Sequence, residues 1–215
     1  MFVLAGDGSW DERTRLISRN GTALADQFGN AVSLSGDRAL IGARLSDEKG
    51  DESGAYIFHM MNGVWQEEAK LVTTDGAGVY IFGYDVAIFG DTAIIRSPYD
   101  ADMASYSDSV YFFIRRDDGT WEEEQRLAPA DSGYYFGWRL AISGDTSAIG
   151  AKRPDDERGR YGGSGGSGYV YTKIDGERTG NITIVPENGA ASAYFESSVA
   201  ILGSTALLVP YQVPL

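Results

Sequence analysis

The stretch that decides the fold is FGYDVAIFGDTAII, residues 82–95, because close copies of it recur along the chain. The copy that begins 54 residues earlier reads FGNAVSLSGDRALI, and the copy 54 residues later reads FGWRLAISGDTSAI. A fourth, more divergent copy, FESSVAILGSTALL, covers residues 195–208. Self-similarity at a fixed period is typical of repeat architectures. The chain is therefore predicted to consist of repeated structural units.

Each period resolves into four predicted strands. In the second repeat, polar and apolar residues alternate in the first predicted strand, residues 84–88, with Val86 and Ile88 as apolar positions. The turn Gly90-Asp91 then leads to a second strand, residues 92–95, which is rich in β-branched residues. A third strand with a tyrosine-apolar-aromatic pattern follows a polar loop. A second glycine turn then leads to a fourth strand that begins with tryptophan. The third strands are residues 56–58, 111–113 and 169–171, the second turns are Asn62-Gly63, Asp118-Gly119 and Asp175-Gly176, and two fourth strands are residues 65–71 and 121–127.

No segment shows a sustained period of 3.6 residues, so little helix is expected. Four antiparallel strands in every 54 to 59 residues are the pattern of a propeller blade, which buries its faces against its neighbours. The sequence thus predicts an all-β chain, a β-propeller of four-stranded antiparallel blades. The predicted blades cover about residues 18–71, 72–127 and 128–184.

The two ends of the sequence hold complementary halves of one more blade. Residues 2–4 and 10–16 match strands three and four, whereas residues 195–209 match strands one and two. We therefore expect a single domain, 1–215, that closes as a four-bladed ring, with a composite blade formed by residues 185–215 and 1–17. The alternatives are a half-ring that pairs with a second copy, giving a homodimer instead of a monomer, or a piece of a longer array.

The repeated phrase, with the acidic loop and SGAYIF (residues 53–58) that follow it, resembles the FG-GAP repeat. This repeat forms the blades of integrin α-subunit propellers and of bacterial and algal extracellular proteins, usually in rings of seven. The resemblance covers about residues 1–211. It implies a non-enzymatic recognition or adhesion scaffold, extracellular or at the cell surface, that binds a protein ligand. Residues 1–5 do not form a signal peptide.

Integrin-type repeats often bind Ca²⁺ through a DxDxDG loop between strands one and two. Here that connection is only Ser-Gly-Asp or Phe-Gly-Asp, and one carboxylate cannot supply the six to eight oxygens that Ca²⁺ takes. We therefore predict no cofactor at these turns, and we interpret Asp37, Asp91 and Asp145 as turn residues that bond nearby backbone amides.

The amino-acid composition limits the classes of partner and of chemistry that can be expected. The chain has 31 acidic and 18 basic residues, a net charge of −13, so nucleic acid is not expected as a partner. It has no cysteine, which excludes disulfides and thiolate chemistry. No apolar run approaches the length of a membrane span.

Candidate ligand-binding residues lie in the loops between strands two and three, which differ from repeat to repeat. A rigid scaffold commonly carries its function on such loops. Four of their carboxylates, Asp100, Asp102, Asp155 and Asp156, are the candidates for a cation site, and a solvated acidic rim is the alternative. The full set is Asp47, Asp51, Tyr99, Asp100, Asp102, Tyr106, Asp155, Asp156 and Tyr161.

A carbohydrate-binding propeller is the alternative function, because sugar faces stack on aromatic rings. Its candidates are Tyr99, Tyr106, Tyr134, Tyr135, Trp138 and Tyr161, although the three aromatics beside the third Phe-Gly pair could instead pack between blades. No catalytic residue is predicted. His59 is the only histidine and is interpreted as a surface residue just after a strand, and the Gly/Ser run 162–168 as a flexible loop.

Overall fold

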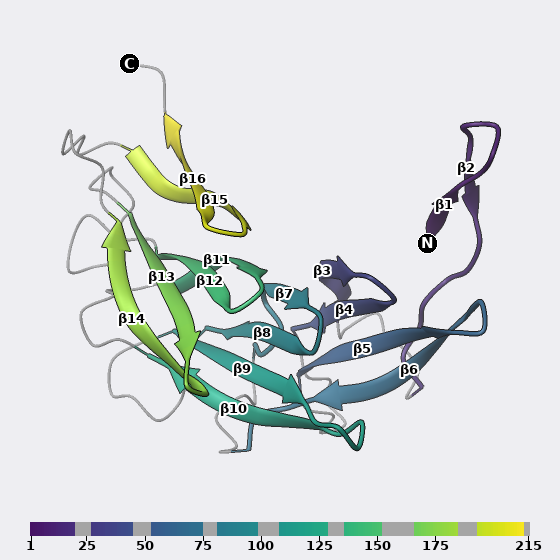
Figure 1. Ribbon diagram of the computed structural model, residues 1–215. Helices are drawn as coiled ribbons and strands as arrows, with labels where there is room; N and C mark the ends of the chain where they lie inside the picture. Colours follow the sequence, from purple (N-terminus) through teal and green to yellow (C-terminus); the bar gives the residue numbers. More distant parts are fainter. Residues whose placement is uncertain are drawn as a thin grey trace.

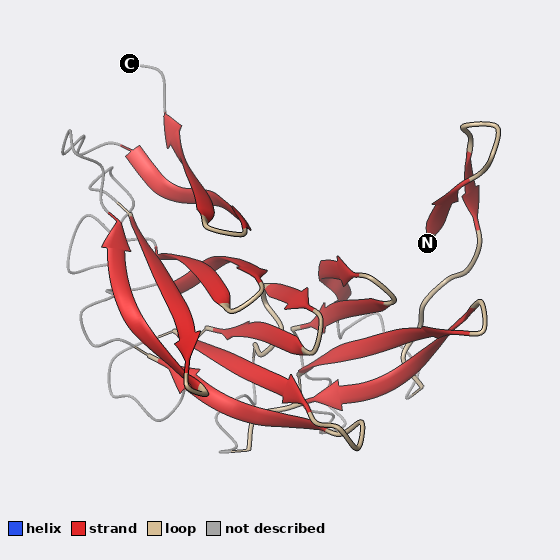
Figure 2. Ribbon diagram, viewed as in Figure 1, coloured by secondary structure: helices blue, strands red, loops and turns tan. Residues whose placement is uncertain are grey.

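The computed structural model describes residues 1–19, 27–44, 53–74, 81–98, 108–128, 136–151, 166–184 and 193–212. These ranges contain strands, turns and loops, and no helix (Figure 2). Accordingly, they hold no helical segment that could cross a bilayer. The expectation of an all-β chain is confirmed.

Three antiparallel sheets of four strands form the blades, and each lies within its predicted range (Figure 1). In every blade the strands are hydrogen-bonded in chain order. Blade one contains β3 (Phe28–Ser35), β4 (Arg38–Ala43), β5 (Gly54–Met61) and β6 (Val64–Leu71). Blade two contains β7 (Val86–Phe89), β8 (Thr92–Ser97), β9 (Ser109–Arg115) and β10 (Trp121–Leu127). Blade three contains β11 (Phe136–Ser143), β12 (Thr146–Ala151), β13 (Ser167–Ile174) and β14 (Glu177–Ile184).

The glycine turns have the geometry that their sequences predict. Gly36, Gly90, Gly144 and Gly203 have φ between 56° and 58°, as the first central residue of a two-residue type II′ turn requires. The following aspartate joins the turn to strand three through its carbonyl oxygen, which accepts a hydrogen bond from Met60 N, Arg115 N or Lys173 N. The carboxylate has another role at Asp37, where it contacts His59 Nε2 at 3.0 Å. A hydrogen bond from the Asp37 backbone amide also lowers the pKa of this carboxyl, so the predicted contact with a turn amide is present at Asp37 beside the contact with His59.

His59 lies within β5, not after it, and its side chain is largely covered. The hydrogen bond from the imidazole is the main reason why the pKa of the exposed Asp37 carboxyl is lowered. The pair joins the turn after β3 to the third strand of the same blade.

The core lies between consecutive blades. One cluster joins Leu40, Ile57 and Leu71 of blade one to the face of blade two, and a second joins blades two and three in the same manner. The receiving faces are Phe82, Val86, Ile88, Ile95, Tyr111 and Phe113 in blade two, and Phe136, Leu140, Ile142, Ile149, Tyr169 and Tyr171 in blade three. Each Phe-Gly phenylalanine packs edge-on against the tyrosine of strand three in its own blade, at a centroid distance of 5.5 Å.

The Phe-Gly glycines permit this close stacking. Gly83 has a φ of 91°, and a Cβ atom on it would lie 2.4 Å from the carbonyl oxygen of Gly54 in blade one. The blade-to-blade spacing therefore depends on the absence of a side chain at this position.

Ion pairs join the outer strands of neighbouring blades. Glu68 of β6 accepts hydrogen bonds from Arg38 in its own blade and from Arg115 in blade two, at 3.0 and 2.6 Å. Burial raises the pKa of the Glu68 carboxyl, but the two guanidinium groups outweigh it and the pKa is lowered overall. Lys173 of blade three contacts Glu124 of blade two in the same way, at 2.5 Å.

The terminal strands do not form the predicted composite blade. Among the described strands, β1 (Phe2–Leu4) pairs only with β2 (Trp10–Glu12), and β15 (Ala193–Leu202) pairs only with β16 (Thr205–Gln212). The blades form an open arc, with β3, β7, β11 and β15 toward its inner side, and the two hairpins stand at its opposite ends (Figure 1). Because the two hairpins lie at opposite ends of the arc, their edges do not meet within one chain.

Candidate functional site: an arginine and aromatic cluster at the loop end

The loop end is the edge of the arc from which all the variable loops depart. At this edge strand two ends and strand three begins, so the chain leaves blade one at Arg44 and returns at Ser53. In blade two it leaves after Ser97 and returns at Asp108. All nine ligand-binding candidates named above lie in these loops, outside the described residues. The described part of the loop end is their base.

A buried ion pair lies at the base of the blade-two loop. Arg96, at the end of β8, donates from Nη2 to Oδ2 of Asp108 at 2.5 Å, and the two side chains are 1% and 2% exposed. The repeats have Gly42 and Gly150 at the position of Arg96, so only blade two has a charge there. The arginine backbone is fixed as well, because its carbonyl accepts from Gly83 N and Tyr84 N, and its amide donates to Asp85 O.

Two aromatic rings hold the guanidinium of Arg96. Its Cζ atom lies 4.6 Å from the ring centroid of Tyr84 in blade two and 5.1 Å from that of Trp138 in blade three. The two centroids are 6.4 Å apart. Cation–π attraction is strongest where water is excluded, as it is around this buried arginine. Within the described part of the chain, Nε and Nη1 of Arg96 have no hydrogen-bond partner, and the two rings lie beside this guanidinium group instead.

Two further arginines extend the contacts toward solvent. The Arg44 guanidinium lies 4.9 Å from the Tyr84 ring, and the Arg139 guanidinium lies 5.7 Å from the Trp138 ring. Arg44 is half-buried and Arg139 is exposed. The five residues, which we call the loop-end cluster, therefore connect all three blades in the order Arg44, Tyr84, Arg96, Trp138, Arg139.

Asp85 lies beside the loop-end cluster. Its Oδ2 accepts a hydrogen bond from Leu140 N of blade three at 2.9 Å. Burial raises the pKa of the Asp85 carboxyl above its ordinary value of 3.8, although Arg139, the Leu140 amide and Arg96 act against that rise. The charged form of Asp85 is thus less favourable in the folded protein than in the unfolded chain.

This raised pKa predicts the effect of Asp85→Asn. An acid whose pKa is raised on folding stabilises the fold below its unfolded value near 3.8, and that stabilisation is lost as pH rises through the folded pKa. Asparagine keeps an oxygen for Leu140 N and never ionises. The variant should therefore have a higher melting temperature than wild type at pH 7, and the difference should vanish near pH 3.5. Melting curves from pH 3.5 to 8 test this, and a difference that does not change with pH would contradict it.

The sequence signal for this site is a set of positions at which one repeat differs from the others. Trp138 was a candidate for glycan stacking or for packing between blades, and the structure places it half-buried against Tyr84 and Arg96. Tyr134 and Tyr135 lie outside the described residues. Arg96 was not predicted as a site residue, yet an arginine at a position that is glycine in two other repeats could have marked it.

No cation site is seen in the described ranges. They contain no group of three or more histidine or carboxylate side chains that could hold a metal ion. The four carboxylates considered for a cation, Asp100, Asp102, Asp155 and Asp156, lie outside these ranges.

Comparison with known families identifies the repeat. The sequence profile described as FG-GAP repeat matches residues 10–58, 65–113 and 121–171, together more than half of the chain. The matches begin at Trp10, Trp65 and Trp121, and each ends within the third strand of the blade that follows. No curated protein matches the sequence.

Proposed function

Because the chain belongs to the FG-GAP repeat family, we propose that it is a non-enzymatic recognition scaffold of the extracellular type. Its ligand is a protein, which binds at the loop end. The acidic loops that hold Asp47, Asp51, Asp100, Asp102, Asp155 and Asp156, with Tyr99, Tyr106 and Tyr161, complete the binding surface around the cluster. No cofactor and no catalytic residue form part of this proposal.

The observation that supports the proposal is the composition and position of the loop-end cluster. Arginine, tyrosine and tryptophan are the residues that most often contribute the binding energy of protein interfaces. Here they are already ordered by contacts across three blades, so little conformational entropy is lost when a partner binds. A protein ligand is favoured over a sugar because two guanidinium groups lie over each ring and compete with a sugar for its face.

Charge reversal at Arg139 tests the proposal. Immobilised wild-type protein would be screened by surface plasmon resonance against purified extracellular-matrix proteins, and in parallel on a glycan array. We expect a protein ligand whose affinity falls at least tenfold in Arg139→Glu. The matched control is Arg116→Glu, which changes the charge by the same amount. Arg116 is an exposed arginine in the turn at the other end of blade two, and it pairs with Glu122.

The two variants separate the outcomes. Equal binding by wild type and Arg139→Glu would place the ligand elsewhere on the molecule. Glycan binding without any protein ligand would overturn the proposal in favour of the carbohydrate-binding alternative.

A further inference from the structure

The first strand of blade one has an apolar face that no other blade covers. Val32 and Leu34 of β3 are 71% and 65% exposed. The repeat aligns them with Val86 and Ile88 in blade two and with Leu140 and Ile142 in blade three, all of which are at most 9% exposed. Those residues are buried because the preceding blade packs on them. The face of β3 therefore has the residues of a receiving face, and none of the described blades covers it.

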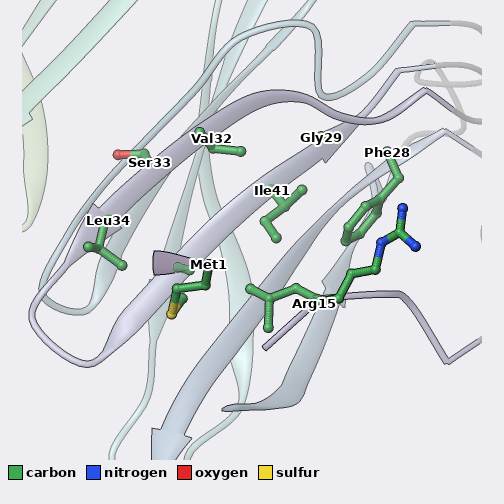
Figure 3. Close-up of a pocket in the computed structure, with 10 residues that line it drawn as sticks. Met1, Arg15, Phe28, Gly29, Val32, Ser33, Leu34 and Ile41 are labelled. Carbon is green, nitrogen blue, oxygen red and sulfur yellow. The ribbon is translucent and has the colours of Figure 1, made fainter. Parts of the chain in front are cut away.

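A cavity of about 520 Å³ marks this face (Figure 3). Its walls are mainly apolar, and Ile41 and Phe28 point into the same space as Val32 and Leu34. Tyr56 and Phe58 of β5 extend the apolar layer beneath it. In blades two and three the corresponding space is filled by a leucine or isoleucine of the preceding second strand, namely Leu40 and Ile94, which are fully buried.

The opposite end of the arc presents the matching side chain. The repeat aligns Leu207 of β16 with Leu40 and Ile94, yet Leu207 is 60% exposed. The other side of the same hairpin is already used, since Leu208 packs so closely on Gly168 of blade three that no Cβ would fit there. β15–β16 is thus docked on blade three through one face, and its second face, which includes Leu207, is uncovered.

The N-terminal hairpin supplies the outer half of the missing blade. Phe2 pairs with Glu12 as Phe58 pairs with Glu67 and Phe113 with Glu123, so β1–β2 has the register of strands three and four. The family profile also begins its first match at Trp10, in β2, and continues to Phe58 in the third strand of blade one. In complete blades, Ala39 and Ala93 of strand two pair with Phe58 and Phe113. The same register would pair Ala206 of β16 with Phe2, and Thr205 with Val3.

We propose that the occupant of the β3 face is β15–β16 of a second copy of this chain. That hairpin pairs with the β1–β2 hairpin of the first copy to form a shared blade, and two-fold symmetry forms a second shared blade at the other junction. The result is a closed ring of eight blades, in which Leu207 of one copy fills the cavity beside Val32 and Leu34 of the other. The new interface continues the one that already joins consecutive blades.

A second copy fits better than the hairpin of the same chain for two reasons. The hairpins lie at opposite ends of an open arc whose two ends face the same direction (Figure 1). The arc cannot easily curve further, because neighbouring blades already meet at contacts that leave no room for a Cβ atom, as at Gly42 against Gly83 and at Gly137 against Val110. A two-fold axis brings the β15–β16 hairpin of each copy toward the β3 face of the other, a meeting that the open arc of one chain does not allow.

The proposal is tested by the mass of the full chain in solution and by two matched leucine variants. Light scattering at micromolar concentration should give twice the chain mass of 23.2 kDa. Leu207→Asp places a charge in the shared interface and should yield monomer at the same concentration, a loss of affinity of at least 100-fold. Leu202→Asp should remain dimeric, although Leu202 is still more exposed than Leu207, because its counterpart Phe89 stays exposed between packed blades.

A covalent readout keeps the proposal falsifiable if a variant misfolds. The chain has no cysteine, so Val3→Cys with Thr205→Cys introduces the only thiols. Cα atoms opposite one another on antiparallel strands are about 4.5–5.5 Å apart, which suits a disulfide. Oxidation should produce a reducible dimer on denaturing gels, whereas Val3→Cys with Asp117→Cys should not. A monomeric wild type, or a disulfide formed within one chain, would overturn the proposal.

Discussion

Asp108→Ala should be among the most destabilising single substitutions in this protein. It would leave Arg96 charged and 1% exposed, without the carboxylate that pairs with its Nη2 atom and with two other guanidinium nitrogens that lack hydrogen bonds within the described residues. Removing one member of a buried ion pair typically costs about 3–5 kcal/mol, because the remaining charge stays desolvated. Urea denaturation followed by tryptophan fluorescence measures the loss, since Trp138 lies against Arg96.

The double variant Arg96→Met, Asp108→Leu is the control for this prediction. Replacing a buried pair by apolar groups of similar size is often nearly neutral, because both desolvation costs disappear together. We expect the double variant to lose less than half as much free energy of unfolding as Asp108→Ala. If Asp108→Ala were within 1 kcal/mol of wild type, as changes at unremarkable surface positions are, the ion pair would not hold the base of the loop.

Gly83→Ala should have an effect of similar size at the boundary between blades one and two. The alanine Cβ would lie 2.4 Å from Gly54 O and 3.1 Å from Ala43 N, both backbone atoms that cannot rotate away. Its φ of 91° also disfavours any side chain. Overpacking and backbone strain together should cost about 3 kcal/mol. In a chain of this size that lowers the melting temperature by roughly 6–12 °C.

Gly90→Ala is the matched control, because it changes the same residue type in the same repeat. Gly90 has a φ of 56°, and a Cβ atom there would meet nothing within 4 Å. Only the backbone preference is lost, so we expect a cost of about 1–2 kcal/mol, below that of Gly83→Ala. Equal losses of unfolding free energy in Gly83→Ala and Gly90→Ala would show that the backbone conformation alone accounts for glycine at position 83. That result would contradict a role of Gly83 in setting the blade spacing.

The sequence predicts the blades well because the features that define them are local and repeated. Strand alternation, the Gly-Asp turns and the Phe-Gly pairs recur at one period, and each is satisfied by neighbours within the same or the next repeat. The closure of the ring is different. Ring closure depends on the angle between neighbouring blades. That angle arises from contacts between two repeats, such as Gly83 against Gly54, so the sequence of one repeat does not specify it.

The candidate site was harder to predict because it depends on residues that do not repeat. Arg96 replaces a glycine, Asp108 ends a variable loop, and Tyr84 and Trp138 occupy one position in different blades. Their contacts cross from blade to blade, so no single repeat shows them. The loop-end cluster is formed by positions whose residue type differs between repeats. This agrees with a candidate site that lies outside the residues that all repeats share.

The most direct test of recognition at the loop end is amide hydrogen exchange of the wild-type protein with and without the protein ligand found in the screen. Peptides that cover residues 81–89 and 136–143 should exchange more slowly when the ligand is bound, because they carry Tyr84, Trp138 and Arg139. Peptides across the outer turns at residues 60–64, 116–120 and 174–178 should be unchanged. Protection confined to those outer turns, with none at the cluster, would contradict recognition through the loop end.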